Sequence, residues 1–290
     1  GNIFITFCAL SKAKGMEIIM SSHVIRHDNI IPLVTRQSIA SRYHKVTKAI
    51  NQEFWNSTSE TTHSLYVGSY GRNTAINTSD IDILIEIPED EYNRYSYSKG
   101  NGQSRLLQAV KNAIETPYSR SDIRADGQVV KIAFSDGMKF EVLPAFPQTS
   151  WGGSVSYKYP DTNMGGNWRT TDPKSEQKAI KEKNSSSNGL LCATCKHIRT
   201  IRDDSYSSYH LSGILIDSFV YVAIGGWHFT DGDSNSSSQP KSYEQVLLDY
   251  YNQISCNGIF VPNLSAPGSE MQIDTTKGWD VLGKILNKMA

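Results

Sequence analysis

The chain has 290 residues, in which 29 lysines and arginines balance 29 aspartates and glutamates, and it contains four cysteines. This length can bury a large core and commonly forms one large domain or two closely packed lobes. The neutral balance argues against a protein held on nucleic acid by net positive charge, and few, unevenly spaced cysteines indicate a reducing, cytoplasmic compartment.

Residues 1–20 are the first segment, an N-terminal extension to which we assign no function. The apolar run 3–10 is a candidate secretory core, but no basic region precedes it and Lys12 and Lys14 follow it. We therefore expect no signal peptide. Since no run approaches the roughly 18–20 apolar residues of a membrane-spanning helix, we also expect no membrane partner.

A long amphipathic helix and a phosphate-binding turn are predicted next. Apolar side chains recur at spacings of three and four, which predicts a helix: Ile39, Tyr43, Val46, Ile50 and Phe54. A strand expected over 64–67 then enters the turn Gly68-Ser69, and residues 72–77 are expected to form a short helical turn. Backbone N–H groups and a hydroxyl at such a turn can bind phosphate.

Two aspartates follow this turn on a predicted strand over 80–87. Side chains two residues apart on a strand share a face, so Asp80 and Asp82 point the same way while Ile81 and Ile83 face the core. Two carboxylates so close repel each other unless a cation lies between them, and a divalent metal is the usual one. A phosphate-binding turn beside metal-binding acids suggests phosphoryl or nucleotidyl transfer.

A third acid is predicted on a hairpin formed by strands 128–134 and 138–143. Phe140 and Val142 would face the core, which places Glu141 on the face of Asp80 and Asp82. Three such acids can hold two metal ions roughly 3.5–4 Å apart, which activate the attacking hydroxyl and stabilise the leaving group. Asp136, in the hairpin turn, is the alternative third acid.

The remaining pattern predicts an α+β fold, with a mixed sheet lobe packed on a C-terminal helical lobe and the active cleft between them. A helix is expected around 106–114, and serine-rich loops are expected at 184–188 and 233–239. The predicted helices of the second half are 173–183, 190–202, 208–224, 242–255 and 277–288. We place the catalytic core, with its preceding helix, at 21–170 and the helical lobe at 171–290.

Cys192 and Cys195 form a C-x-x-C pair that invites a zinc interpretation. A structural zinc needs four ligands, and a second pair at suitable spacing is missing from the sequence. The segment 190–202 is predicted to be a helix with Leu191, Thr194, Cys195 and Ile198 on one stripe, which favours small buried cysteines in a helical core instead.

The acidic motifs resemble those of the DNA polymerase beta-like nucleotidyltransferase superfamily, whose signature is a Gly-Ser turn, a helix and an Asp-x-Asp strand. More narrowly, the chain resembles the cGAS/DncV-like nucleotidyltransferases, bacterial relatives of animal cyclic GMP–AMP synthase. Further matching segments are 140–146, with its Pro-Ala ending, 159–173, 195–199 and 207–211. The family usually has Asp as its third carboxylate, where this chain has Glu141.

The resemblance implies roles for residues of the helical lobe, which is similar to the C-terminal part of oligoadenylate synthases. Lys196 would hold the donor triphosphate, Ser208 would contact phosphate and Tyr209 would stack on the donor base. Arg199 is expected to line the cleft, and Arg72 to support the turn or reach phosphate.

The resemblance also implies a function. It implies a magnesium-dependent enzyme, with two Mg²⁺ ions or Mn²⁺ as a substitute, that makes a cyclic di- or trinucleotide second messenger from ATP, GTP or other nucleoside triphosphates. The implied context is bacterial anti-phage (CBASS) signalling, with a messenger-activated effector and CBASS accessory proteins as partners. The zinc-bearing insertion with which the animal enzyme binds double-stranded DNA has no equivalent in the sequence, so DNA sensing is disfavoured. A linear product, as in the oligoadenylate synthases or in nucleotide addition to RNA or protein, and an inactive nucleotide-binding module are the alternatives.

Overall fold

A seven-stranded mixed sheet organises the N-terminal lobe of the computed structural model, which describes residues 23–26, 31–97, 99–230, 235–236, 241–256 and 259–290. Its strands are β1 (Ser64–Tyr66), β2 (Ile81–Glu86), β3 (Asp122–Asp126), β4 (Val129–Ala133), β5 (Lys139–Thr149), β6 (Val155–Asp161) and β7 (Asn167–Thr171). The order is β1-β2-β5-β4-β3, with β6 paired to β5 and β7 to β6. Strands β2 and β5 pair in parallel, and the other pairs are antiparallel.

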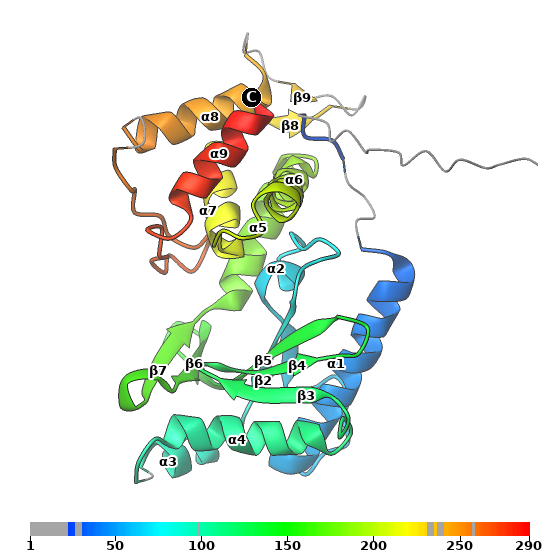
Figure 1. Ribbon diagram of the computed structural model, residues 1–290. Helices are drawn as coiled ribbons and strands as arrows, with labels where there is room; N and C mark the ends of the chain where they lie inside the picture. Colours follow the sequence, from blue (N-terminus) through cyan, green and yellow to red (C-terminus); the bar gives the residue numbers. More distant parts are fainter. Residues whose placement is uncertain (1–22, 27–30, 98, 231–234, 237–240, 257–258) are drawn as a thin grey trace, which may run out of the picture.

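Three helices cover one face of this sheet (Figure 1). They are α1 (Leu33–Phe54), α3 (Glu89–Ser96) and α4 (Gly102–Glu115). The apolar stripe of α1 packs with alternate residues of β2 and β5, among them Ile83 and Val142, which are fully buried. Burial of one face of each strand fixes the register, and it directs the polar side chains of β2 and β5 to the opposite face.

The opposite face of the sheet looks toward the C-terminal lobe. The short helix α2 (Gly68–Gly71) lies over it, and a small cluster of Val67, Leu84, Ala145 and Tyr157 is buried there. A 3₁₀ turn, η1 (Asn163–Gly165), joins β6 to β7, and helix α5 (Pro173–Ser186) leads from the sheet into the second lobe. Asp172 caps α5 by accepting a hydrogen bond from the Ser175 amide at 3.0 Å, and Pro173 occupies the first turn.

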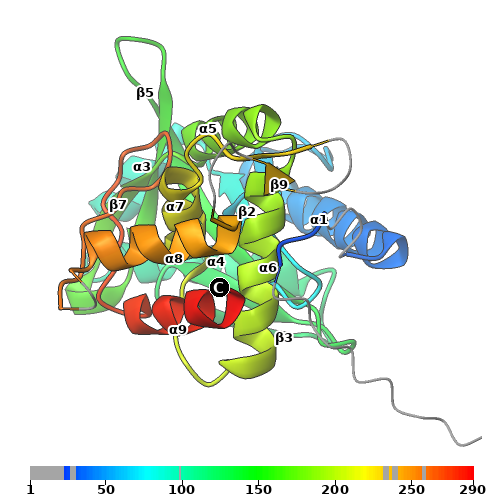
Figure 2. The same ribbon diagram turned by 90° about the horizontal axis from the view of Figure 1, so that it is seen from above.

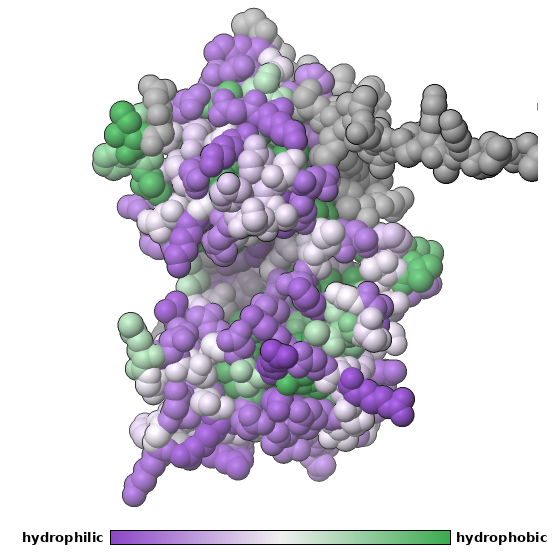
Figure 3. Space-filling model, viewed as in Figure 1, coloured by the Kyte–Doolittle hydropathy of each residue, from purple (hydrophilic) through white to green (hydrophobic). Residues whose placement is uncertain are grey.

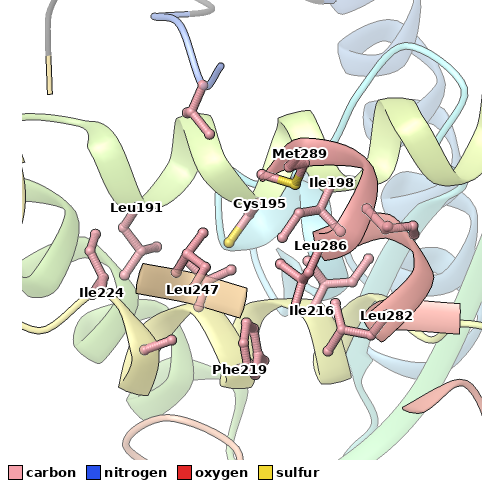
Figure 4. Close-up of a cluster of buried hydrophobic side chains, with 14 of the residues drawn as sticks. Leu191, Cys195, Ile198, Ile216, Phe219, Ile224, Leu247, Leu282, Leu286 and Met289 are labelled. Carbon is pink, nitrogen blue, oxygen red and sulfur yellow. The ribbon is translucent and has the colours of Figure 1, made fainter. Parts of the chain in front are cut away.

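The C-terminal lobe is helical and has its own hydrophobic core. Its remaining elements are α6 (Leu190–Ser205), α7 (Gly213–Ala223), β8 (His228–Phe229), β9 (Asn235–Ser236), α8 (Tyr243–Ile254) and α9 (Trp279–Met289). Seen from above, α6 runs across the ends of α8 and α9 (Figure 2). Side chains of α6, α7, α8 and α9, including Cys195, Phe219, Leu247 and Leu286, interdigitate in this core (Figure 4).

The expected arrangement of a mixed sheet lobe on a helical lobe is confirmed. Cys192 and Cys195 lie buried on α6, as the helical stripe predicts. Within the described residues, every helix is too short or too polar to cross a lipid bilayer. Residues 1–20 lie outside the described residues, as does most of the predicted loop 233–239, of which 235–236 form β9.

Three local predictions are wrong. The helical turn expected over 72–77 lies earlier, at Gly68–Gly71, because the amides of Thr74 and Ala75 donate to the Ser69 carbonyl and end the helix. The predicted loop 184–188 is helical as far as Ser186, and within this last turn the Ser185 hydroxyl donates back to the Lys181 carbonyl at 2.9 Å.

The third error concerns the helix predicted over 208–224, which begins at Gly213. Ser212 caps it by accepting a hydrogen bond from the Leu215 amide. Ser208 and Tyr209 therefore lie in the connection between α6 and α7 rather than at a helix start.

Candidate functional site

Two carboxylates lie side by side on the sheet face that looks toward the helical lobe. Asp82 of β2 and Glu141 of β5 are direct partners in the parallel register. Residues paired in this way on neighbouring strands point to the same face of a sheet. Ile83 and Val142, one residue further on, are fully buried on the other face. The alternation predicted for both strands is thus what brings the two acids together.

Asp80 completes the acidic group from the segment just before β2. It is exposed and lies one residue ahead of the strand. Its negative charge raises the pKa of both Asp82 and Glu141. All three predicted acids therefore lie within electrostatic range of one another.

Burial and nearby negative charge disfavour the charged forms of Asp82 and Glu141. Burial, followed by the charge of Glu141, raises the pKa of Asp82 to about 7, against the lowering effect of Arg72. Burial also raises the pKa of Glu141, while Lys131 opposes the shift. A divalent cation placed between the acids would relieve this repulsion.

The donor set fits a hard divalent cation, because Mg²⁺ and Mn²⁺ prefer carboxylate oxygens. Within the residues that the structure describes, no three acid, histidine or cysteine side chains are gathered closely enough to enclose one ion. Asp82 and Glu141 share a face and a strand register, and Asp80 lies just before the strand, so these three acids are the residues that would hold such an ion.

Gly68 places the predicted phosphate-binding turn directly on Asp82. Its φ of +58° lies in the left-handed region, and a Cβ added there would lie 1.8 Å from Asp82 Oδ2. The Val67 amide also donates to the Asp82 carbonyl at 2.9 Å. Glycine is therefore required both by the backbone conformation and by the close approach of the carboxylate. Ser69 is the next residue, so the backbone at Gly68 brings the predicted phosphate-binding turn next to the acidic group.

Lys131 is a member of the site that the sequence analysis missed. It is the cross-strand partner of Glu141 on β4, and its Nζ lies 3.7 Å from Glu141 Oε1 and 2.7 Å from Asp126 Oδ2. The hairpin register carried this signal, since pairing Phe134 with Met138 across the turn places Lys131 opposite Glu141.

Asp136, the alternative third acid, has a different role. Arg42 donates to both of its carboxylate oxygens at 3.0 and 2.8 Å, and this pairing holds the pKa of Asp136 below its ordinary value. Its Oδ1 also accepts a hydrogen bond from the Met138 amide within the turn. Asp136 thus braces the hairpin against α1.

Lys196 lies on the face of α6 that contacts the catalytic segment. On this helix, the Cys192 thiol donates to the Arg72 carbonyl at 4.0 Å, and Asp203 accepts a hydrogen bond from the Thr78 hydroxyl at 2.5 Å. Residues 192, 196 and 203 are four and seven positions apart, which puts them on one helical face. Lys196 therefore lies on the side of α6 that faces the segment connecting the turn to β2. The surface of the molecule is hollowed between the two lobes (Figure 3).

Ser208 and Tyr209 are exposed in the connection that follows α6. Lys284 of α9 places its Nζ 5.2 Å from the centre of the Tyr209 ring, and the Tyr206 ring lies edge-on to it. The 52% exposure of Tyr209 leaves ring surface available for stacking. Its role in binding a nucleotide base, like that of Ser208, stays a prediction.

A cavity of about 390 Å³ adjoins Asp80 on the side of α1. Its wall includes Thr35 and Ser38 of α1, Ser79, and Met138 of the hairpin turn. Both polar and apolar side chains therefore line this cavity beside Asp80.

Comparison with known proteins identifies the family. The model of the Second Messenger Oligonucleotide or Dinucleotide Synthetase domain matches residues 25–184, which is more than half of the chain. The chain belongs to this family. The match spans every strand of the sheet, with all three acids, and ends within α5.

The chain is similar to one curated relative in sequence and to solved structures in fold, at low sequence identity. A probable cyclic nucleotide synthase of Bacillus cereus (strain VD146) is 25% identical over 201 residues, and the matched part spans 62% of this chain and 58% of that relative. The solved CdnE cyclic dinucleotide synthase of Elizabethkingia meningoseptica is 13% identical, with a TM-score of 0.59 over 87% of this chain and 89% of that chain. The CdnE c-UMP-AMP synthase of Rhodothermus marinus is also 13% identical, with a TM-score of 0.55 over 92% of each chain. The α+β fold predicted from the sequence is confirmed.

A buried ion network joins the two lobes of this synthetase-family chain. Asp217 of α7 is fully buried and accepts hydrogen bonds from Arg72 Nε at 2.8 Å and from a terminal nitrogen of Arg199 at 2.7 Å. Arg72 also donates to Glu176 of α5 at 3.0 Å, and the Thr74 hydroxyl donates to Asp217 at 2.9 Å.

This network shows where Arg72 and Arg199 lie and what they bind. Arg72 supports the turn, which is one of the two roles predicted for it. Arg199 is only 1% exposed, so the expectation that it lines the cleft is wrong. Paired charges buried so deeply are costly to separate, and they fix the turn that begins at Gly68 relative to α7.

Proposed function

We propose that this chain is a nucleotidyltransferase that joins nucleoside triphosphates into a cyclic di- or trinucleotide with release of pyrophosphate. The observation that supports this most is the pairing of Asp82 with Glu141 beneath the Gly68-Ser69 turn. Membership of the second messenger synthetase family supports the same chemistry. We propose 21–170 as the catalytic core and 171–290 as the lobe that completes the nucleotide pocket.

Asp80, Asp82 and Glu141 would hold two Mg²⁺ ions, with Mn²⁺ as a substitute. When bound, these ions supply charge that makes a hydroxyl nucleophilic at neutral pH and stabilises the leaving group. Burial and neighbouring negative charge raise the pKa of Asp82 and of Glu141, so a bound cation would compete with the proton and would stabilise the ionised carboxylates. Glu141 is one methylene longer than the family's usual aspartate, and it would share a cation with Asp82, its partner in the parallel register.

The other residues would bind and orient the donor. The backbone of Gly68 and the hydroxyl of Ser69 would hold phosphate oxygens next to Asp82. Lys196, facing the cleft from α6, would balance the charge of the terminal phosphates as a mobile point charge. Ser208 would contact phosphate, and the exposed ring of Tyr209 would stack on the donor base, which contributes about 1–3 kcal/mol in comparable sites.

We propose bacterial anti-phage (CBASS) signalling in the cytoplasm as the biological setting. ATP, GTP or other nucleoside triphosphates would be the substrates. An effector activated by the messenger would act downstream, with CBASS accessory proteins as further partners. Double-stranded DNA is disfavoured as an activator, because the chain has no net positive charge.

Incubation with the four labelled triphosphates and Mg²⁺, followed by phosphatase treatment and mass spectrometry, tests the proposed activity. A phosphatase-resistant product of two or three nucleotides is the expected result, and the product of an Asp80→Asn/Asp82→Asn variant should fall below detection. A phosphatase-sensitive product would show that the enzyme makes a linear product instead of a cyclic one. Nucleotide binding without pyrophosphate release, in every metal and nucleotide mixture, would point to an inactive binding module.

A further inference from the structure

A second cavity, of about 540 Å³, lies between α5 and the segment that follows α2. Its volume falls within the roughly 300–1,000 Å³ range of small-molecule sites. Lys174, Lys178 and Lys181 line it from α5, and their spacing of four and three residues puts them on one face of that helix. Asn73 and Asn184 add carboxamides to the wall.

The cavity wall is basic, although the chain as a whole is neutral. No acidic residue is among the described residues that line it. Lys174 is partly compensated, since its Nζ lies 3.9 Å from Glu86 Oε1 and over the Tyr157 ring. Lys178 and Lys181 are exposed, and neither side-chain ammonium group forms a hydrogen bond or ion pair with another residue that the structure describes. Two uncompensated ammonium groups therefore face the same space.

Other polar groups of the wall are already fixed by the fold. Arg72 is bound to Asp217 and Glu176, so its charge is neutralised within the protein. The side-chain oxygen of Asn184 accepts a hydrogen bond from the Cys192 amide at 2.9 Å. That bond leaves the Asn184 NH₂ group as a donor for an anion.

This cavity is separate from the acidic group. Gln177 of α5 donates to the Tyr66 carbonyl at 2.7 Å, which places α5 against β1, the edge strand of the sheet. The acids lie beyond this edge, on β2 and β5. Helix α2 separates the two sites, because Asp82 packs against Gly68 at its start while Gln177 packs against Gly71 at its end. Figure 1 shows α5 and α2 next to each other between the lobes.

We propose that this cavity is a binding site for a small molecule that carries two or more linked phosphate groups. Lys178 and Lys181 supply ammonium donors to the phosphate oxygens, and the Asn184 amide supplies a further hydrogen bond. A concave wall formed by one helix and one turn suits a compact polyphosphate or nucleotide better than an extended polymer.

A ligand in this cavity would contact the chain that holds the catalytic turn. Gly71 and Asn73 belong to the wall, and the Ser69 carbonyl accepts hydrogen bonds from the amides of Thr74 and Ala75 just beyond it. Occupation of the cavity thus acts on the same short segment that positions Ser69.

Metal-free calorimetry with inorganic tripolyphosphate tests the site without depending on catalysis. We expect binding at 0.15 M salt that is about tenfold weaker in a Lys178→Gln/Lys181→Gln variant, since two charge-assisted contacts are lost. A Lys45→Gln/Lys48→Gln variant is the matched control, because it makes the same charge change at the same spacing on α1. A Ser69→Ala/Lys196→Gln variant tests the catalytic cleft and should keep this binding.

Lysine acetylation of the wild-type chain, followed by mass spectrometry, gives a second readout that needs no variant. Tripolyphosphate should protect Lys178 and Lys181 at least several-fold relative to Lys45. Titration of the Ser69→Ala/Lys196→Gln variant with ATP, compared with its titration with tripolyphosphate, then shows whether a nucleotide or an inorganic polyphosphate is the preferred ligand. Unchanged binding in the Lys178→Gln/Lys181→Gln variant, or loss of binding in the Ser69→Ala/Lys196→Gln variant, would overturn the proposal. So would a short RNA that binds Lys178 and Lys181 far more tightly than either small ligand.

Discussion

Gly68 brings the backbone so close to Asp82 that a side chain at this position would occupy the same space as the carboxylate. A Gly68→Ala substitution should therefore reduce nucleotide synthesis by about 100-fold or more, because small displacements of reacting groups have effects of this size. The strained backbone should cost about 1–3 kcal/mol in the free energy of unfolding. Product formation and denaturant unfolding measure the two effects separately.

Gly225 offers a matched control for this substitution. Its φ of +53° is similar, but nothing lies within 4 Å of an added Cβ. Gly225→Ala should therefore show the backbone strain without the loss of activity. Equal activity losses in the two variants would contradict the proposed role of the contact between Gly68 and Asp82.

The raised pKa of Asp82 makes divalent cation binding depend on pH near neutrality. Burial and the charge of Glu141 raise this pKa to about 7, so the carboxyl group is protonated below that pH and ionised above it. Since a metal binds the ionised form, the affinity for Mg²⁺ or Mn²⁺ should fall about tenfold per pH unit below 7 and level off above 8. Calorimetry at pH 6 in buffers of different ionisation enthalpy should detect about one proton released per binding event. An affinity that does not change between pH 6 and 8 would contradict this assignment.

The hairpin of β4 and β5 supplies a positive charge that competes with the metal. Lys131 Nζ lies 3.7 Å from Glu141 Oε1, so it both repels a cation and occupies a ligand oxygen. Both effects act in the same direction, and Lys131→Gln should therefore bind Mn²⁺ about threefold more tightly at pH 8. Lys139→Gln, on the same hairpin, controls for the change in net charge. Weaker Mn²⁺ binding in the Lys131→Gln variant would show that the lysine helps the site instead.

The contact between α7 and the catalytic turn depends on one buried carboxylate. Asp217→Asn would leave Arg72 and Arg199 buried without their shared counter-charge, which should cost about 3–5 kcal/mol in the free energy of unfolding. Glu115→Gln removes an exposed ion pair with Lys111 and should cost only about 0.3–0.5 kcal/mol. Denaturant unfolding compares the two variants. Similar losses in both would mean that the buried network does not join the lobes.

The elements that the sequence predicts well are those with a repeating hydrophobic pattern. Alternation along β2 and β5 predicted that Asp82 and Glu141 share a face, and the three-four spacing from Ile39 to Phe54 predicted α1. The helix at Gly68–Gly71 was misplaced because it is only four residues long and has no repeating pattern. The start of α7 was misplaced because a single capping residue, Ser212, determines it.

Contacts between residues far apart in the chain lie beyond such patterns. Arg72 and Asp217 are separated by 145 positions, and no local signal in the sequence pairs them. The position of Lys131 beside Glu141 could have been predicted, because the register of one hairpin determines it. Side-chain periodicity therefore revealed which acids meet, but not how the two lobes are joined around them.

A donor nucleotide held between the lobes should stabilise the whole molecule. Ser69 belongs to the sheet lobe, whereas Lys196 and Tyr209 belong to the helical lobe, so a ligand that contacts all three binds only the folded chain. A non-hydrolysable ATP analogue at about 100 times its dissociation constant, with Mg²⁺, should add about 2.7 kcal/mol to the free energy of unfolding. For a chain of this size, that corresponds to a rise in melting temperature of about 4–5 °C. Differential scanning calorimetry with and without the analogue measures the shift, and an Asp80→Asn/Asp82→Asn variant should lose most of it. A full shift in that variant would show that the nucleotide binds without the acidic group, which would separate binding from the proposed catalytic centre.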